Sequence, residues 1–231
     1  MRRLVLFDID GTLVSSHGGI GRVAISRVMT DLHGAAVDVT VEDCAGKPDP
    51  QIVRNVLIRL GYGPDDVSRL LPETVSRYLD RLEATYSEAA GAYCHEGVPE
   101  LVGLLAARKD VTLGLLTGNI ERGARIKLGP FGLNPHFPFG AYGSDRENRM
   151  ELGPIAVERA RAHTGIDFRG KDIVVIGDTQ HDVRCAGPVG GTAIAVATGP
   201  VSREALAAEN PDFLCDSLVP TEALLGAILG G

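Results

Sequence analysis

Residues 4–16 read LVLFDIDGTLVSS and join a short apolar run directly to two acids. The unbroken apolar run at residues 4–7 is typical of a strand buried on both faces of a parallel sheet. Asp8 and Asp10 follow it. Because residues i and i+2 of a strand project from the same face, both carboxylates are expected to converge just past the sheet. Two like charges buried together are costly unless a cation or a proton joins them, so we interpret this stretch as a functional site.

Three further apolar runs resemble the first, and they lie at residues 111–116, 173–176 and 192–197. Helical patterns, with apolar residues three or four positions apart, lie at residues 100–108, 155–163 and 221–229. This alternation of strands and helices predicts an α/β fold with a parallel sheet. Functional sites in such sheets gather at the carboxyl ends of the strands.

Residues 15–93, called the insert below, have a different pattern that contains no convincing buried strand. Helical patterns cover residues 21–32, 50–60 and 72–90, and Pro72 is expected to open the last of these helices at its first turn. We therefore predict that residues 15–93 form a smaller all-helical cap domain. It would be inserted after the first strand of a core domain formed by residues 1–14 and 94–231.

Composition and charge argue against several classes of protein. The 231 residues carry a formal net charge of −7 and no run of Lys or Arg, which argues against nucleic acid as a partner. The four cysteines are far apart and are expected to be free thiols. The sequence shows neither a secretion signal nor an apolar stretch of the ~20 residues that span a membrane. We expect a cytoplasmic protein without a membrane partner, and the sequence leaves its oligomeric state open.

Thr117-Gly118-Asn119 follows the apolar run at 111–116. A hydroxyl and free backbone N–H groups at such a point can form a cradle for an anion. The alternative is that Asn119 caps the helix that follows.

Charged residues follow the later apolar runs. Asp178 comes at the end of a third strand, and with Asp182 it suits a hard cation that takes oxygen ligands. A site that holds several carboxylates and an anionic substrate also needs fixed positive charge. Arg146 and Arg149 both precede a predicted helix, and chemistry alone does not choose between them.

In this order, Asp-x-Asp-Gly-Thr, Thr-Gly-Asn, Arg149 and Gly-Asp-x-x-x-Asp resemble the motifs of the haloacid dehalogenase superfamily. The motifs span residues 8–182, and the pattern of strands and helices covers nearly the whole chain. The resemblance implies a Rossmann-like core, with helices on both faces of its sheet, that transfers phosphoryl groups through an aspartyl phosphate with Mg²⁺. The insert resembles the helical cap of the phosphoglycolate phosphatase and β-phosphoglucomutase-like branch.

The resemblance also implies roles for the matching acids. Asp8 would be the nucleophile, and Asp10 would be the acid/base while its backbone carbonyl ligates the metal. Asp8 and Asp178 would also ligate Mg²⁺, and Asp182 would support that shell. Asp10 must give a proton to the leaving oxygen while Asp8 stays ionised, so the two acids need opposite protonation states.

The remaining matching residues would bind the phosphoryl group. Thr117 would contact its oxygens, together with Gly118 and Asn119. The position of the family's Lys or Arg, counted back from the helix at 155–163, favours Arg149 over Arg146. Arg keeps the charge of Lys but not its compact ammonium.

We predict a phosphatase acting on a small phosphorylated metabolite. Lys47 lies in a Gly/Pro-rich loop, residues 45–50, that resembles the family's substrate-specificity loop. Lys47 is therefore a candidate for holding the non-reacting part of the substrate, and a solvated surface lysine is the alternative interpretation. A phosphosugar mutase of the β-phosphoglucomutase type would use the same residues.

Three other activities are disfavoured. A haloacid dehalogenase lacks the second acid, because a halide needs no protonation, and here Asp10 is present. A phosphonatase would need a Schiff-base lysine in the insert; Lys47 is the one lysine there and leaves this activity open, but nothing else in the sequence supports it. Residues 19–24 match G-x-G-x-x-A, but they lie too far beyond the first strand for a dinucleotide-binding turn. A non-catalytic nucleotide-binding module is disfavoured on that ground.

Overall fold

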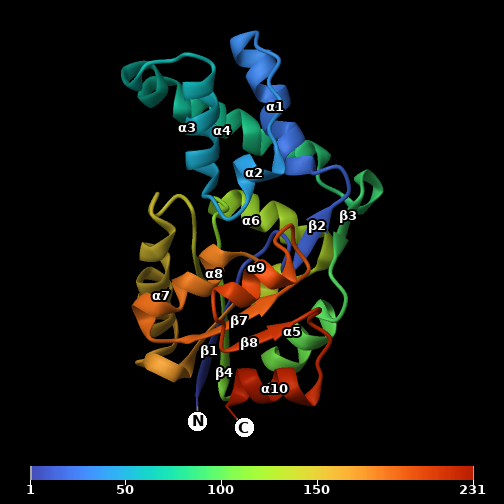
Figure 1. Ribbon diagram of the computed structural model, residues 1–231, viewed down its shortest axis with the longest axis vertical. Coiled ribbons are helices and arrows are strands. Elements are labelled where there is room, and N and C mark those ends of the chain that lie inside the picture. The colour runs from blue at the N-terminus through green and yellow to red at the C-terminus, as the bar shows by residue number, and fades with distance from the viewer. Residues whose placement is uncertain (1, 231) are drawn as a thin grey trace.

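The computed structural model describes residues 2–230, and a six-stranded sheet lies at the centre of its larger part (Figure 1). The strands are β1 (Arg3–Phe7), β4 (Val111–Leu116), β5 (Gly140–Ala141), β6 (Ile173–Gly177), β7 (Thr192–Val196) and β8 (Phe213–Cys215). Their order across the sheet is β5-β4-β1-β6-β7-β8, and all neighbouring pairs are parallel. The predicted α/β fold with a parallel sheet is confirmed.

Helices cover both faces of the sheet because successive residues of β1 point to opposite sides. Val5 and Phe7 belong to one buried apolar cluster, and Leu4 and Leu6 belong to another. The helices packed on the Val5 side are α5 (Val98–Ala106), α6 (Glu121–Leu128) and α10 (Glu222–Leu229). Those on the Leu4 side are α7 (Leu152–Thr164), α8 (Gln180–Cys185) and α9 (Arg203–Ala208). This is the Rossmann-like core that the sequence predicts.

All four predicted strands are present, whereas β5 and β8 were not predicted. These two strands lie at the edges of the sheet and are only two and three residues long. Such short segments show too few residues for an apolar pattern to be recognised. Short 3₁₀ helices occur at η1 (Glu88–Ala90), η2 (Gly129–Phe131), η3 (Asn134–His136), η4 (Arg149–Glu151), η5 (Gly170–Asp172) and η6 (Gly187–Val189).

The insert forms a separate helical layer beyond the carboxyl end of the sheet (Figure 1). Its helices are α1 (Ile20–His33), α2 (Val41–Cys44), α3 (Asp49–Arg59) and α4 (Pro64–Thr85). Ile25, Val53 and Leu82, which come from α1, α3 and α4, are buried together in a third apolar cluster. The insert therefore has its own small core.

The two ends of the insert form an antiparallel ribbon that the sequence did not predict. β2 (Val14–Ser16) pairs with β3 (Ala92–Cys94), so Ser15 lies opposite Tyr93. The predicted boundaries at 14/15 and 93/94 fall inside this ribbon. The insert is helical as expected, with α1 and α3 close to their predicted ranges, but its connection to the core is a pair of strands.

The expectation for Pro72 is wrong, because α4 begins eight residues earlier, at Pro64. Pro64 occupies the first turn, where a missing N–H costs nothing, and Asp65 and Asp66 favour that end of the helix dipole. Pro72 lies inside the helix, where the carbonyl of Ser68 loses its usual donor. Packing of the continuous buried face of α4 outweighs this local cost.

Replacing Pro72 tests how much stability that interior proline costs. We expect Pro72→Ala to raise the free energy of unfolding by roughly 1–2 kcal/mol, since an interior proline costs ~3 kcal/mol but also restricts the unfolded chain. Urea unfolding measures the change. Pro64→Ala, at the first turn, is the matched control and should change it little. A loss of stability in Pro72→Ala would show that α4 needs the proline to pack.

No helix of residues 2–230 combines the length and the apolar character needed to cross a membrane.

Candidate active site

The carboxyl ends of the three central strands bring the predicted residues together. Asp8 follows β1, Thr117 follows β4 and Asp178 follows β6, and β1 is paired with both other strands. A cavity of about 460 Å³ lies over them, with further walls from the insert, among them Ile25 and Tyr78. This volume is in the range of small-molecule sites.

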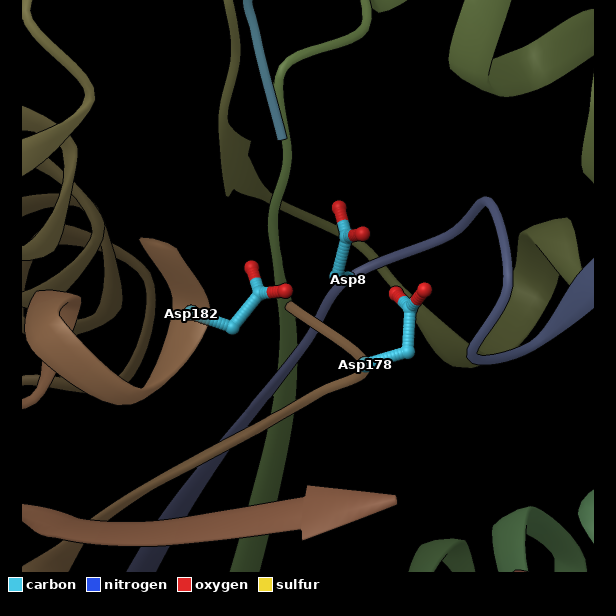
Figure 2. Close-up of side chains that lie close together, drawn as sticks. All are labelled: Asp8, Asp178 and Asp182. Carbon is cyan, nitrogen blue, oxygen red and sulfur yellow. The ribbon is translucent and has the colours of Figure 1, made fainter. Parts of the chain in front are cut away.

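Three buried carboxylates form the centre of the site. Asp8, Asp178 and Asp182 each place an oxygen within 4.8 Å of the others. Figure 2 shows their side chains close together, from the ends of β1 and β6 and from α8. The sequence predicted these three acids from two motifs that are far apart in the chain.

Arg149 is the cation that pairs with two of these carboxylates. Its Nη2 lies 3.1 Å from Oδ1 of Asp8 and also contacts Asp182. Its Nη1 donates to the carbonyl of Gly46 in the insert, at 3.2 Å. Arg146 is exposed instead and pairs with Glu151 at 3.3 Å. Of the two arginines left open by chemistry, the structure places Arg149 in the site.

Burial and mutual repulsion disfavour ionisation of the clustered acids. Burial raises the pKa of Asp8 to about 7; Arg149 acts against this shift, and Asp182 and Asp10 add to it. Burial, Asp182 and Asp8 likewise raise the pKa of Asp178. Three carboxylates and one guanidinium would leave two negative charges uncompensated. An ionised Asp8, as a nucleophile requires, therefore needs further positive charge beside it.

The donor set fits a hard divalent cation. Asp178 accepts a hydrogen bond from the hydroxyl of Thr12 through Oδ1, at 3.1 Å. Its Oδ2 is buried and has no hydrogen-bond partner among the described residues. An orphaned carboxylate oxygen beside a second carboxylate suits the oxygen ligands that Mg²⁺ takes. Gly11, at φ +81°, passes so close that a Cβ there would lie 2.2 Å from this oxygen.

Asp182 is held differently from the other two acids. Its Oδ2 accepts from the backbone N–H and the hydroxyl of Thr179, at 2.9 and 2.6 Å, while Oδ1 accepts from Arg149. Both oxygens are thus already hydrogen-bonded. This is the arrangement expected of a residue that supports a metal shell, and its role stays a prediction.

The Thr117-Gly118-Asn119 turn lies against both acids of the first motif. The Asn119 amide donates to Thr117 Oγ1, at 2.9 Å, and to Asp10 Oδ2, at 2.8 Å. Asn119 does not cap α6, whose N-cap is Ile120 without a side-chain bond. The helix-capping alternative is therefore wrong. Phosphoryl binding by Thr117, Gly118 and Asn119 stays a prediction.

Lys127 and Asp49 also lie beside the site, and neither was predicted from the sequence. Lys127, on α6, forms an ion pair with Asp10 at 2.6 Å. Asp49, at the start of α3, accepts the N–H of Ile120 and donates its own N–H to the carbonyl of Gly118. Each resembles an ordinary solvated charge in a helix, because its partner lies far away in the chain. No local pattern could have found either one.

Lys47 lines the cavity, but its ammonium bonds elsewhere. Nζ donates to the carbonyls of Glu42 and Asp43, at 2.7 and 3.2 Å, and so binds the end of α2. Its own carbonyl lies 2.6 Å from where a Cβ of Gly118 would stand. The backbone of this loop thus closes the cavity, and a specificity role for the Lys47 side chain stays a prediction.

Ionisation of the buried Asp49 carboxyl makes the stability of the protein depend on pH. Burial raises its pKa to about 6, with Lys127 acting against the shift. The folded-state pKa lies above the unfolded value, so ionisation costs stability as pH rises from about 4 to 6. Asp49→Asn keeps an oxygen for the Ile120 N–H but cannot ionise. We expect it to be more stable than the parent at pH 7.5, by up to about 3 kcal/mol, and equal to it near pH 4.

Urea unfolding of both proteins at the two pH values measures this difference. A difference that is the same at both pH values would contradict the assignment of the buried charge to Asp49.

Comparison with known proteins agrees with the fold. A family model described as a haloacid dehalogenase-like hydrolase matches residues 2–190. The chain belongs to this family and is a hydrolase, as its motifs predict.

Relatives of similar length extend the comparison. A 5'-nucleotidase of Pseudomonas aeruginosa is 28% identical over 227 residues, covering 96% of this chain and 94% of the relative. A phosphoglycolate phosphatase of Rhodospirillum rubrum is 28% identical over 211 residues, covering 90% and 84%. Among solved structures, Rhodobacter sphaeroides CbbY in complex with phosphate has a TM-score of 0.73 at 17% identity, over 99% of both chains. A hydrolase of Pseudomonas syringae has a TM-score of 0.67 at 17% identity, over 95% of both. These likenesses support the fold.

Proposed function

We propose that the protein is a Mg²⁺-dependent phosphatase that hydrolyses a small phosphomonoester through an aspartyl phosphate on Asp8. The observation that carries the proposal is the cluster of Asp8, Asp178 and Asp182 around Arg149 at the strand ends. The names of the relatives, a nucleotidase and a phosphoglycolate phosphatase, support a phosphomonoester as substrate.

The reaction would proceed in two displacements. An oxygen of Asp8 attacks phosphorus, and the ester oxygen leaves with a proton from Asp10, giving the aspartyl phosphate and an alcohol. Water then attacks the same phosphorus while Asp10 takes up a proton. Phosphate leaves, and the Asp8 carboxylate is restored.

Arg149 has a donor available for the phosphoryl group. Its Nε is buried and has no acceptor among the described residues, although its other nitrogens are bonded. A buried donor without a partner costs about 1–3 kcal/mol, which a bound anion would recover. Thr117 lies across the same cavity, and its hydroxyl acts to lower the pKa of Asp8.

Asp8, Asp178 and the backbone carbonyl of Asp10 would hold the metal. When bound, Mg²⁺ offsets the repulsion between the Asp8 carboxylate and an anionic phosphate. The excess of negative charge around Asp8 is consistent with this role.

The insert would act as a lid over the core formed by residues 1–14 and 94–231. The N–H of its Asp49 donates to the carbonyl of Gly118 in the Thr117-Gly118-Asn119 turn, and its helices line part of the cavity. Closure of such a lid excludes water and selects the substrate. A phosphosugar mutase would use the same groups, and no contact of the described residues favours it over hydrolysis.

Phosphate release tests the proposal. The purified protein with Mg²⁺ should release phosphate from p-nitrophenyl phosphate, and Asp8→Asn should abolish turnover without unfolding the protein. Arg149→Met should lower kcat/KM by at least ~10²-fold, because a buried charge at the reacting group is lost. Arg146→Met, at the exposed arginine nearby, is the control and should retain activity. Turnover retained by Asp8→Asn would rule out the nucleophile assignment.

Thermal unfolding tests the metal site without relying on activity. Mg²⁺ should raise the melting temperature of the protein, since a ligand of the folded state stabilises it. Asp178→Asn should remove this increase, while Asp216→Asn, at an exposed ion pair with Arg203, should keep it. An equal Mg²⁺ response in both variants would contradict the site.

A further inference from the structure

Lys127 is a buried cation with no part in the reaction steps above. It lies in the last turn of α6, and its side chain is only 6% exposed. Its Nζ donates to both oxygens of Asp10, at 2.8 and 2.6 Å, and to Oδ1 of Asn119, at 2.6 Å. An ammonium has three N–H donors, so each one has an acceptor. In this arrangement Lys127 has no donor left for a substrate anion.

Asp10 depends on this contact for its position. Its side chain is 52% exposed, whereas that of Asp8 is 8% exposed and packed into the site. Apart from Lys127, its carboxylate accepts from the Asn119 amide, at 2.8 Å. A half-exposed carboxylate without these two partners would be free to exchange between rotamers. Lys127 and Asn119 together hold the Asp10 side chain in one rotamer.

The two acids of the first motif thus have separate cations. Arg149 pairs with Asp8 and Lys127 pairs with Asp10, on different elements of the core. Lys127 and Asp10 both lie outside the insert, so movement of the insert need not break their pair. The pair itself therefore uses no group of the insert.

We propose that Lys127 is a positioning residue: its ammonium holds one oxygen of the Asp10 carboxyl while the other oxygen carries the proton that passes to the leaving ester oxygen. The proposal rests on the proposed function, because Asp10 needs an aligned position only if it transfers that proton. Positioning of this kind matters most where the leaving oxygen is basic. A general acid contributes ~10²–10⁴-fold to such a step.

Two aryl esters of similar shape provide the test. Phenyl phosphate has a basic leaving oxygen that needs a proton, whereas p-nitrophenyl phosphate releases a stable anion that does not. We expect Lys127→Met to lower kcat/KM about 10²-fold for phenyl phosphate and less than ~10-fold for p-nitrophenyl phosphate. The ratio kcat/KM reports the steps up to formation of the aspartyl phosphate, so the rate of the later attack of water does not affect it.

Companion variants separate positioning from a general loss of structure. Asp10→Asn should show the same preference between the esters, and Lys127→Met combined with Asp10→Asn should be no worse than Asp10→Asn alone. Lys171→Met removes a surface lysine paired with Asp212 and should change neither ester. Circular dichroism and thermal unfolding check the fold, and Lys127→Gln, which keeps a neutral donor, replaces Lys127→Met if that variant does not fold.

The outcomes distinguish the two proposals. Equal losses on both esters, unchanged rates on both, or additive losses in the double variant would overturn the role of Lys127 while leaving the phosphatase in place. A parent protein that hydrolyses neither ester would overturn the proposed function, and the inference with it.

Discussion

The site depends on one guanidinium that is placed among three buried acids. Arg149 contacts Asp8 and Asp182 directly, and Asp178 belongs to the same cluster. One positive charge reduces the cost of burying these carboxylates without removing it, as the raised pKa of Asp8 shows. The remaining repulsion makes the strand ends a strong site for a small cation. The same excess of negative charge therefore gives Arg149 a structural role and makes the strand ends suitable for a metal ion.

The first motif also shows why its two acids are separated by one residue. Ile9 lies between them, is fully buried, and belongs to the apolar cluster that contains Val5 and Phe7. It anchors the chain while Asp8 and Asp10 remain on the cavity side. Burial of an apolar side chain thereby fixes the direction of two charged ones.

Much of the core and of the candidate site could be predicted because the signals are local. β1, β4 and β6 are mostly apolar, and polar residues follow the end of each. The contacts that were missed join residues far apart in the chain: Lys127 lies 117 positions from Asp10, and Asp49 lies 71 positions from Ile120. A pattern of neighbouring residues does not show contacts between residues so far apart in the chain. Pro72 shows the converse, since a sound local rule was overridden by the packing of α4 against α1 and α3.

Two of the hydrogen bonds that join the insert to the core use main-chain atoms of the insert. The carbonyl of Gly118 accepts the N–H of Asp49, and the carbonyl of Gly46 accepts from Arg149. Peptide groups are the same in every residue, so substitutions at many loop positions would leave these attachments unchanged. The side chains that face the cavity could then diverge while the lid keeps its register on the core. Such a division would let one set of catalytic groups be reused for different alcohols during evolution.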